Sequence, residues 1–135
     1  MYALDSNAVI GYLNGRQPGL ASRLEAEMRI GAILLIPVVV LYELLYGAAR
    51  SDRDDHNRAR IAEFLTGPFD VLDFTPADAA EAADIRAHLE RRGAPIGPYD
   101  TMIAAQARRR GATLVTANHR EFARVPGLSV DDWTE

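Results

Sequence analysis

One stretch of the sequence decides the fold: AILLIPVVVLYELLYGAA, residues 32–49. Its first five residues, 32–36, form a short continuous apolar run, which is typical of a buried strand in a parallel sheet. Pro37 suits the first turn of a helix, and the pattern predicts that this helix extends to about Ala49. A buried strand that leads directly into a helix is the beginning of a βαβ unit.

The same alternation continues on both sides of this stretch. Apolar runs predict further strands, and apolar residues at three- and four-residue spacing predict crossover helices. The order of these elements predicts an α/β fold: a three-layer α/β/α sandwich with a parallel sheet of four to five strands, built as a single domain over residues 1–135. The predicted strands are 2–4, 32–36, 71–74 and 113–116, with a weaker one at 128–130, and the predicted helices include 53–65, 76–92 and 100–110.

Composition excludes several kinds of chemistry. The chain has 135 residues and no cysteine, so disulfide scaffolds, thiolate metal sites and cysteine nucleophiles are excluded. All 15 basic residues are arginine, which excludes a phosphate-binding or Schiff-base lysine. The net charge of −4 argues against a basic nucleic-acid coat protein, but it is compatible with an enzyme that holds cations in an acidic site.

Nothing in the sequence suggests a membrane protein. No apolar run reaches the roughly 18 residues that a transmembrane helix needs. The N-terminus, MYALDSNAVI, has no basic lead and carries Asp5 where a signal peptide would be apolar. We therefore expect a cytoplasmic protein.

Three acidic residues have informative positions in this predicted fold. Ligands of open α/β sheets bind at the carboxyl ends of the strands, and Asp5 closes the first strand there. Glu43 lies among apolar residues of its helix, where burying a carboxylate is costly. Asp100 opens an Ala-rich helix. Each also has an ordinary explanation: Asp5 as a helix N-cap, Glu43 on a solvent-facing stripe, and Asp100 favouring a helix dipole.

A fourth acid follows the strand at 113–116. The segment TANHREF, residues 116–122, puts hydroxyl, amide and carboxylate groups at the same sheet edge, with Glu121 as the acid. Acids from four separate segments would repel one another, so their convergence predicts a bound cation. Oxygen ligands without thiolate favour Mg²⁺, with Mn²⁺ as a substitute.

Several segments in this order resemble the PIN-domain ribonucleases, and in particular the VapC toxins of bacterial type II toxin–antitoxin pairs. The resemblance covers nearly the whole chain and implies a quartet of acids around a divalent ion: Asp5, Glu43, Asp100 and Glu121, with Asp5 and Asp100 as metal ligands. It also implies polar groups that orient the site or the substrate: Ser6, Asn7, Thr116 and Asn118. The family often has two adjacent Asn residues where this chain has Ala117-Asn118. The segments that carry the resemblance are LDSN (4–7), YELLYG (42–47), PIGPYD (95–100) with IAA (103–105), LVTAN (114–118), REF (120–122), and the tail RVPGL (124–128) with DW (132–133).

The resemblance further implies metal-assisted hydrolysis of RNA, tRNA or another structured RNA, with water as the nucleophile. It implies two protein partners, a small cognate VapB-type antitoxin and a second copy of the chain in a homodimer. Arg108, Arg120 and Arg124 follow site segments and are candidates for contacts with RNA phosphates. For Arg108, a favourable interaction with its helix C-terminus is an equal explanation.

Two other function classes share this fold pattern. A phosphoacceptor receiver module also has an acidic pocket, but it normally keeps a lysine near paired acids, and here lysine is absent and Asp5 stands alone. A catalytically silent interaction domain would not need all four acids. Both alternatives are therefore less favoured than the nuclease.

Overall fold

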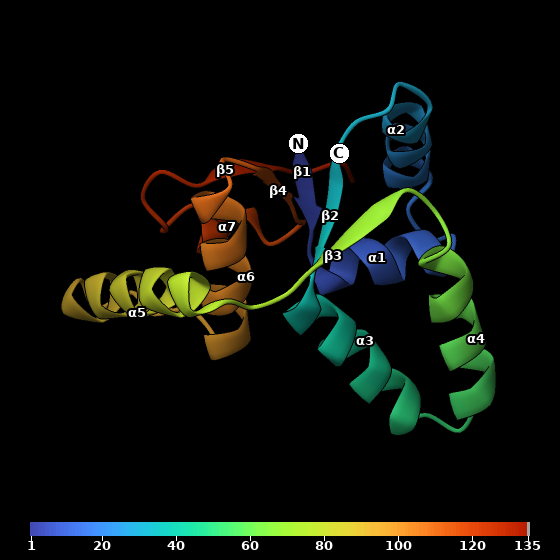
Figure 1. Ribbon diagram of the computed structural model, residues 1–135, viewed down its shortest axis with the longest axis horizontal. Helices are drawn as coiled ribbons and strands as arrows, with labels where there is room; N and C mark the ends of the chain where they lie inside the picture. Colours follow the sequence, from blue (N-terminus) through green and yellow to red (C-terminus); the bar gives the residue numbers. More distant parts are fainter. Residues whose placement is uncertain (135) are drawn as a thin grey trace.

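A computed structural model describes residues 1–134 of the chain. Its centre is a five-stranded parallel sheet with strand order β3-β2-β1-β4-β5 (Figure 1). Ala3 of β1 pairs with Leu35 of β2 on one side and with Leu114 of β4 on the other. The predicted fold class is confirmed, with the weak fifth strand present. The strands are β1 (Tyr2–Leu4), β2 (Leu34–Pro37), β3 (Phe69–Leu72), β4 (Thr113–Val115) and β5 (Ser129–Asp131).

The helices lie on both sides of this sheet. The chain first moves outward from β1 to β3 and then returns to β4 beyond β1. Since parallel crossovers are right-handed, the helices of the outward and return paths cover opposite faces, as Figure 1 shows for α1 to α4 and for α5 with α6. The helices are α1 (Ser6–Leu13), α2 (Pro18–Arg29), α3 (Val38–Ala49), α4 (Asp54–Phe64), α5 (Pro76–Arg91), α6 (Pro98–Arg109) and the short α7 (His119–Phe122).

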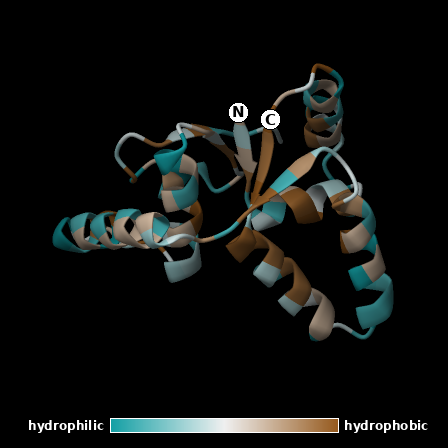
Figure 2. Ribbon diagram, in the orientation of Figure 1, coloured by the Kyte–Doolittle hydropathy of each residue, from teal (hydrophilic) through white to brown (hydrophobic). Residues whose placement is uncertain are grey.

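The hydrophobic core joins the central strands to α3 and α6. Ile36, Leu114 and Ala104 are fully buried. Alanine at three buried positions of α6 lets this helix lie close to the sheet, as its sequence predicts. Figure 2 shows the central strands and the start of α3 as hydrophobic, whereas the outer surfaces of α4 and α5 are hydrophilic.

The structure differs from the sequence-based prediction at several elements. β3 is an edge strand with Asp70 and Val71 exposed, so the expectation that it is buried is wrong. Pro37 ends β2 and caps α3 instead of lying in the first turn of the helix. Helix α2 is not predicted from the sequence; it begins at Pro18 and carries a helix-disfavouring glycine in its first turn. Within residues 1–134, no helix combines the length and apolar character required to cross a bilayer.

Candidate active site

The site lies where the chain reverses its path across the sheet. β1 lies between β2 and β4. The chain continues from β1 to β2 on one side, and after β3 it crosses back to form β4 on the other side of β1. Ligands of open α/β sheets bind at such a switch point, outside the carboxyl ends of the strands. Asp5 follows β1 at this edge and Thr116 follows β4, and both side chains are buried.

Asp5 is fixed by the backbone around it. It is the N-cap of α1, and its Oδ1 accepts a hydrogen bond from the backbone N–H of Ala8 at 2.8 Å. The N-cap explanation for Asp5 is therefore confirmed. Burial raises the pKa of Asp5, hydrogen bonds from Thr116 and Ala8 lower it, and the charges of Glu43 and Asp132 raise it further, with a net upward shift. Hydrogen bonds thus fix the orientation of the Asp5 side chain, and its surroundings are negatively charged.

Glu43 lies in α3, and a residue of α1 holds its side chain in place. The Ser6 hydroxyl donates a hydrogen bond of 2.6 Å to Glu43 Oε1 and so connects the first turn of α1 with the middle of α3. Ser6 and Glu43 are both partly buried. A hydrogen bond to a charged acceptor offsets part of the cost of burying this carboxylate. The structure therefore brings together Ser6 and Glu43, which are 37 residues apart.

The pKa of Asp100 reflects the charges of the other three acids. This residue lies in the first turn of α6, where the helix dipole favours an ionised carboxylate. Nevertheless, its pKa is raised to about 6, first by burial and then by the charges of Glu43, Asp5 and Glu121. Acids from the cap of α1 and from α3, α6 and α7 therefore share one electrostatic environment. The convergence of these four residues is what the sequence predicts.

Glu121 and two polar side chains complete this edge of the sheet. Asn118 Nδ2 donates to Glu121 Oε2 at 3.1 Å, and the backbone N–H of Asn118 donates to Thr116 Oγ1 at 2.9 Å. A chain of contacts thus leads from Glu121 through Asn118 to Thr116 and Asp5. Asn7 lies exposed on the first turn of α1.

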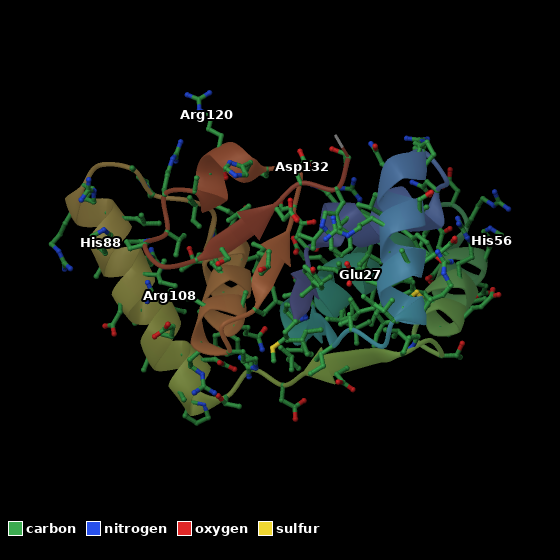
Figure 3. All side chains as sticks on the ribbon, turned by 90° about the horizontal axis from the view of Figure 1, so that it is seen from above. Glu27, His56, His88, Arg108, Arg120 and Asp132 are labelled. Atoms are coloured by element: carbon green, nitrogen blue, oxygen red, sulfur yellow. The ribbon has the colours of Figure 1, made fainter. Side chains whose placement is uncertain are left out.

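One member of the cluster is not predicted from the sequence. Asp132 directly follows β5, which pairs with β4, and its charge raises the pKa of Asp5. Figure 3 labels it near the end of the chain. Its position at the carboxyl end of a strand is the signal that could have identified it, but the three-residue β5 was only weakly predicted.

The donor set fits a hard divalent cation, since it consists of carboxylates with hydroxyl and amide oxygens nearby. Their mutual repulsion, which adds to burial in raising the pKa of Asp100, is what a cation would relieve. Over residues 1–134, no three His, Cys, Asp or Glu side chains stand close enough together to enclose an ion directly. Mg²⁺ usually takes only one or two carboxylates and keeps several waters, so a wider ring of acids suits this ion.

The candidate RNA-binding arginines have different surroundings. Arg108 Nε contacts Glu81 at 2.8 Å and its Nη1 donates to the Pro126 carbonyl, so it links α6 to its neighbours. It also lies about 12 Å along the helix from Asp100. Arg124 donates to the carbonyl of Pro95, which precedes α6. Arg120 is exposed and points away from the molecule in Figure 3, which also shows Arg108 between α5 and α6.

A large hollow lies elsewhere on the molecule. A hollow of about 520 Å³ between α1, α2 and α4 is lined by residues that include Tyr12, Met28 and Phe64 and by none of the clustered acids. Cavity size therefore does not identify the site in this protein. The electrostatic coupling of the acids does.

Comparisons with known proteins place the chain in a family with this fold. The PIN domain family profile matches residues 2–128. The chain is 40% identical over 133 residues to the tRNA(fMet)-specific endonuclease VapC of Shigella flexneri, and this match covers 98% of both chains. It is 36% identical over 132 residues to the protein of the same name from Salmonella typhimurium, covering 98% of this chain and 97% of that protein.

Solved structures show the same fold. The crystal structure of VapBC2 from Rickettsia felis, bound to a DNA fragment from its promoter, aligns with a TM-score of 0.90 and 31% identity over 98% of each chain. DNA-bound VapBC from Salmonella typhimurium aligns with a TM-score of 0.89 and 36% identity, covering 98% of this chain and 97% of that one.

Proposed function

The chain belongs to the PIN domain family, and we propose that it is an endoribonuclease that hydrolyses RNA phosphodiester bonds with Mg²⁺, for which Mn²⁺ can substitute. One observation carries this proposal: four acids from separate elements lie close enough together that the charges of Glu43, Asp5 and Glu121 add to burial in raising the pKa of Asp100 to about 6. In a chain without cysteine or lysine, this cluster is the group of residues best suited to phosphodiester hydrolysis.

Each acid has a role that follows from how it is held. Asp5 and Asp100 would hold the divalent ion, with Glu121 as a further candidate. When bound, such an ion lowers the pKa of a coordinated water and offsets negative charge on the attacked phosphate. Glu43, fixed by the Ser6 hydroxyl, orients the attacking water. Asn118 positions Glu121 through its amide.

The proposed hydrolysis forms one bond to phosphorus and breaks another. The water oxygen forms a bond to phosphorus, the ester P–O bond breaks, and the leaving oxygen gains a proton. Arg120, which is exposed, and Arg124, which is tethered beside the start of α6, are suited to hold the phosphates of the RNA. Arg108 is a weaker candidate for this role because Glu81 and Pro126 already engage it.

We also propose that the protein is the toxin of a toxin–antitoxin pair in the cytoplasm. Its relatives are VapC nucleases, and their solved structures are VapBC complexes. A VapB-type antitoxin is therefore the expected partner, together with a second copy of the chain. Because two relatives are named tRNA(fMet)-specific endonucleases, tRNA(fMet) is the first substrate to test.

The test uses the purified protein, tRNA(fMet), and a second tRNA as a specificity control. We expect discrete cleavage in Mg²⁺, loss of cleavage in EDTA and recovery when Mg²⁺ is restored. Asp100→Asn, prepared identically, should be inactive. Cleavage that survives EDTA or Asp100→Asn would contradict the proposal, as would labelling of Asp5 by acetyl phosphate with no RNA cleavage.

A further inference from the structure

Three exposed tyrosines form a cluster beside the acids. Tyr42 and Tyr46 lie one turn apart on the outer face of α3, and Tyr99 lies in the first turn of α6. Their exposed fractions are 51%, 56% and 43%. The Tyr42 and Tyr46 rings are nearly parallel, with centroids 6.5 Å apart, and the Tyr99 ring packs edge-on to Tyr42 at 5.5 Å. The Tyr42 and Tyr99 hydroxyl oxygens are 3.5 Å apart, so one hydroxyl donates to the other.

This cluster adjoins the proposed catalytic acids. Tyr42 immediately precedes Glu43, and Tyr99 immediately precedes Asp100. α3 and α6 contact each other, so the cluster bridges the two helices that carry these acids. An RNA strand whose scissile phosphate lies at the acids would therefore pass over or next to the tyrosine rings.

We propose that Tyr42, Tyr46 and Tyr99 form a stacking surface for unpaired bases of the RNA substrate. The inference rests on the proposed nuclease function and adds to it the class of RNA, which is single-stranded at the site of cleavage. Base–aromatic stacking is tolerant of sequence because every base has a π face. Two nearly parallel rings on one helix face suit successive bases of a single strand.

The charge around the site explains why stacking is needed there. Carboxylates that no bound cation offsets repel a polyanion, so charge alone gives the RNA only a weak hold next to them. Stacking does not depend on net charge and supplies affinity in this region. At the far end of the cluster, the Arg50 guanidinium lies 5.7 Å from the centre of the Tyr46 ring, where it is placed to meet a phosphate.

The direct test is fluorescence of a short single-stranded RNA that carries 2-aminopurine, whose emission is quenched by stacking. An Asp5→Asn background keeps the RNA intact. We expect Tyr42→Leu and Tyr99→Leu to weaken binding about fivefold or more and to reduce the quenching, because Leu keeps apolar bulk but cannot stack. Tyr42→Phe and Tyr99→Phe should bind within about twofold of the Asp5→Asn parent, since a phenyl ring still stacks.

Two controls separate stacking from other roles. Ile30, which is 77% exposed on a different part of the surface, provides a matched variant, and Ile30→Ala should not change RNA binding. A fully duplex RNA of the same sequence should bind equally to all variants because its bases are already stacked. Circular dichroism verifies that each variant is folded.

Several outcomes would overturn the inference. Unchanged binding and quenching in the Leu variants would remove the tyrosines from the RNA site. A change in oligomeric mass by light scattering, with RNA binding unaffected, would instead assign the cluster to contact with a second copy of the chain. If Asp100→Asn abolishes cleavage while Tyr42→Leu leaves kcat/KM unchanged, the stacking surface fails and the nuclease function stands. If the wild-type protein cleaves no RNA but tyrosine-dependent quenching persists, the nuclease function fails and the stacking surface stands.

Discussion

Replacing Asp100 with Asn should stabilise the metal-free protein at neutral pH while it abolishes activity. The folded protein raises the pKa of this carboxyl from 3.8 to about 6, so ionising it in the folded state is costly. Complete conversion of this shift gives about 3 kcal/mol, at about 1.4 kcal/mol for each pKa unit. Asp100 is only partly buried, and screening by solvent reduces the expected gain to about 1 kcal/mol.

The sign of the pH dependence follows from proton binding. Between about pH 3.8 and pH 6 the folded chain holds a proton on Asp100 that the unfolded chain has already released. The free energy of unfolding therefore falls as the pH rises through this window and becomes level above it. The Asp100→Asn variant has no carboxyl at this position, so its free energy of unfolding does not fall for this reason. Urea denaturation in EDTA should show the variant as more stable at about pH 7.5, with most of the difference gone at about pH 4.

A matched control comes from α4. Asp55 is exposed in the first turn of that helix, so Asp55→Asn loses the same favourable helix-dipole interaction without relieving the acid cluster. We expect Asp55→Asn to be equal to or slightly less stable than the wild type at both pH values. The electrostatic reasoning is refuted if Asp100→Asn is the less stable protein at about pH 7.5, or if its advantage is the same at about pH 4.

Four further predictions test other parts of the structure. Saturating Mg²⁺ should raise the melting temperature of the wild type, by an amount that corresponds to about 2.7 kcal/mol at a hundredfold excess over Kd, whereas no shift in differential scanning fluorimetry would argue against a metal site. Asp5→Asn should be inactive but at least as stable as the wild type without metal, because Asn also caps helices, whereas Asp5→Ala should lose about 1 kcal/mol in urea denaturation. Ser6→Ala removes the hydrogen bond that holds Glu43 and should reduce single-turnover cleavage about 10- to 100-fold, with the fold intact by circular dichroism. Arg110→Met removes a partner of the fully buried Asp78 and should cost about 2 to 3 kcal/mol by urea denaturation, below the usual cost of an unpaired buried charge because a second arginine remains.

The fold could be predicted from the sequence because its strong signals are local. Thr75-Pro76 predicts a helix start, and the structure has a full capping box there. Gly93 and Gly111 follow their helices with φ of 68° and 66°, a conformation that favours glycine. The burial of β3 could not be predicted in the same way. Whether a short apolar strand lies at the centre or the edge depends on the strand order, which is set by contacts distant in sequence.

The positions of the candidate site residues could be predicted only where the signal is local. Asp5, Glu43 and Asp100 could be identified because each follows or interrupts a clear apolar pattern. Asp132 could not, since it joins the cluster only through the pairing of β5 with β4. The contacts of Arg108 could not be predicted either, because its partner Glu81 is 27 residues away on another helix.

The positions of the acids show how this fold tolerates their mutual repulsion. Asp5, Asp100 and Glu121 all lie at helix N-termini: Asp5 caps α1 directly after β1, Glu121 lies in the first turn of α7 after β4, and Asp100 lies in the first turn of α6, which follows α5. Each helix N-terminus stabilises a nearby carboxylate by about 0.3 to 1 kcal/mol. Glu43 lies in the middle of α3, beyond the reach of this effect, and it is the acid that receives a hydrogen bond from Ser6.

These local supports do not offset both burial and the repulsion among the acids, since the pKa of Asp100 remains about 6. The remaining repulsion is the free energy that a divalent cation would relieve on binding. Metal-dependent stability and RNA cleavage should therefore disappear together in the same acid variants. A variant that loses one and keeps the other would separate the metal site from the chemistry.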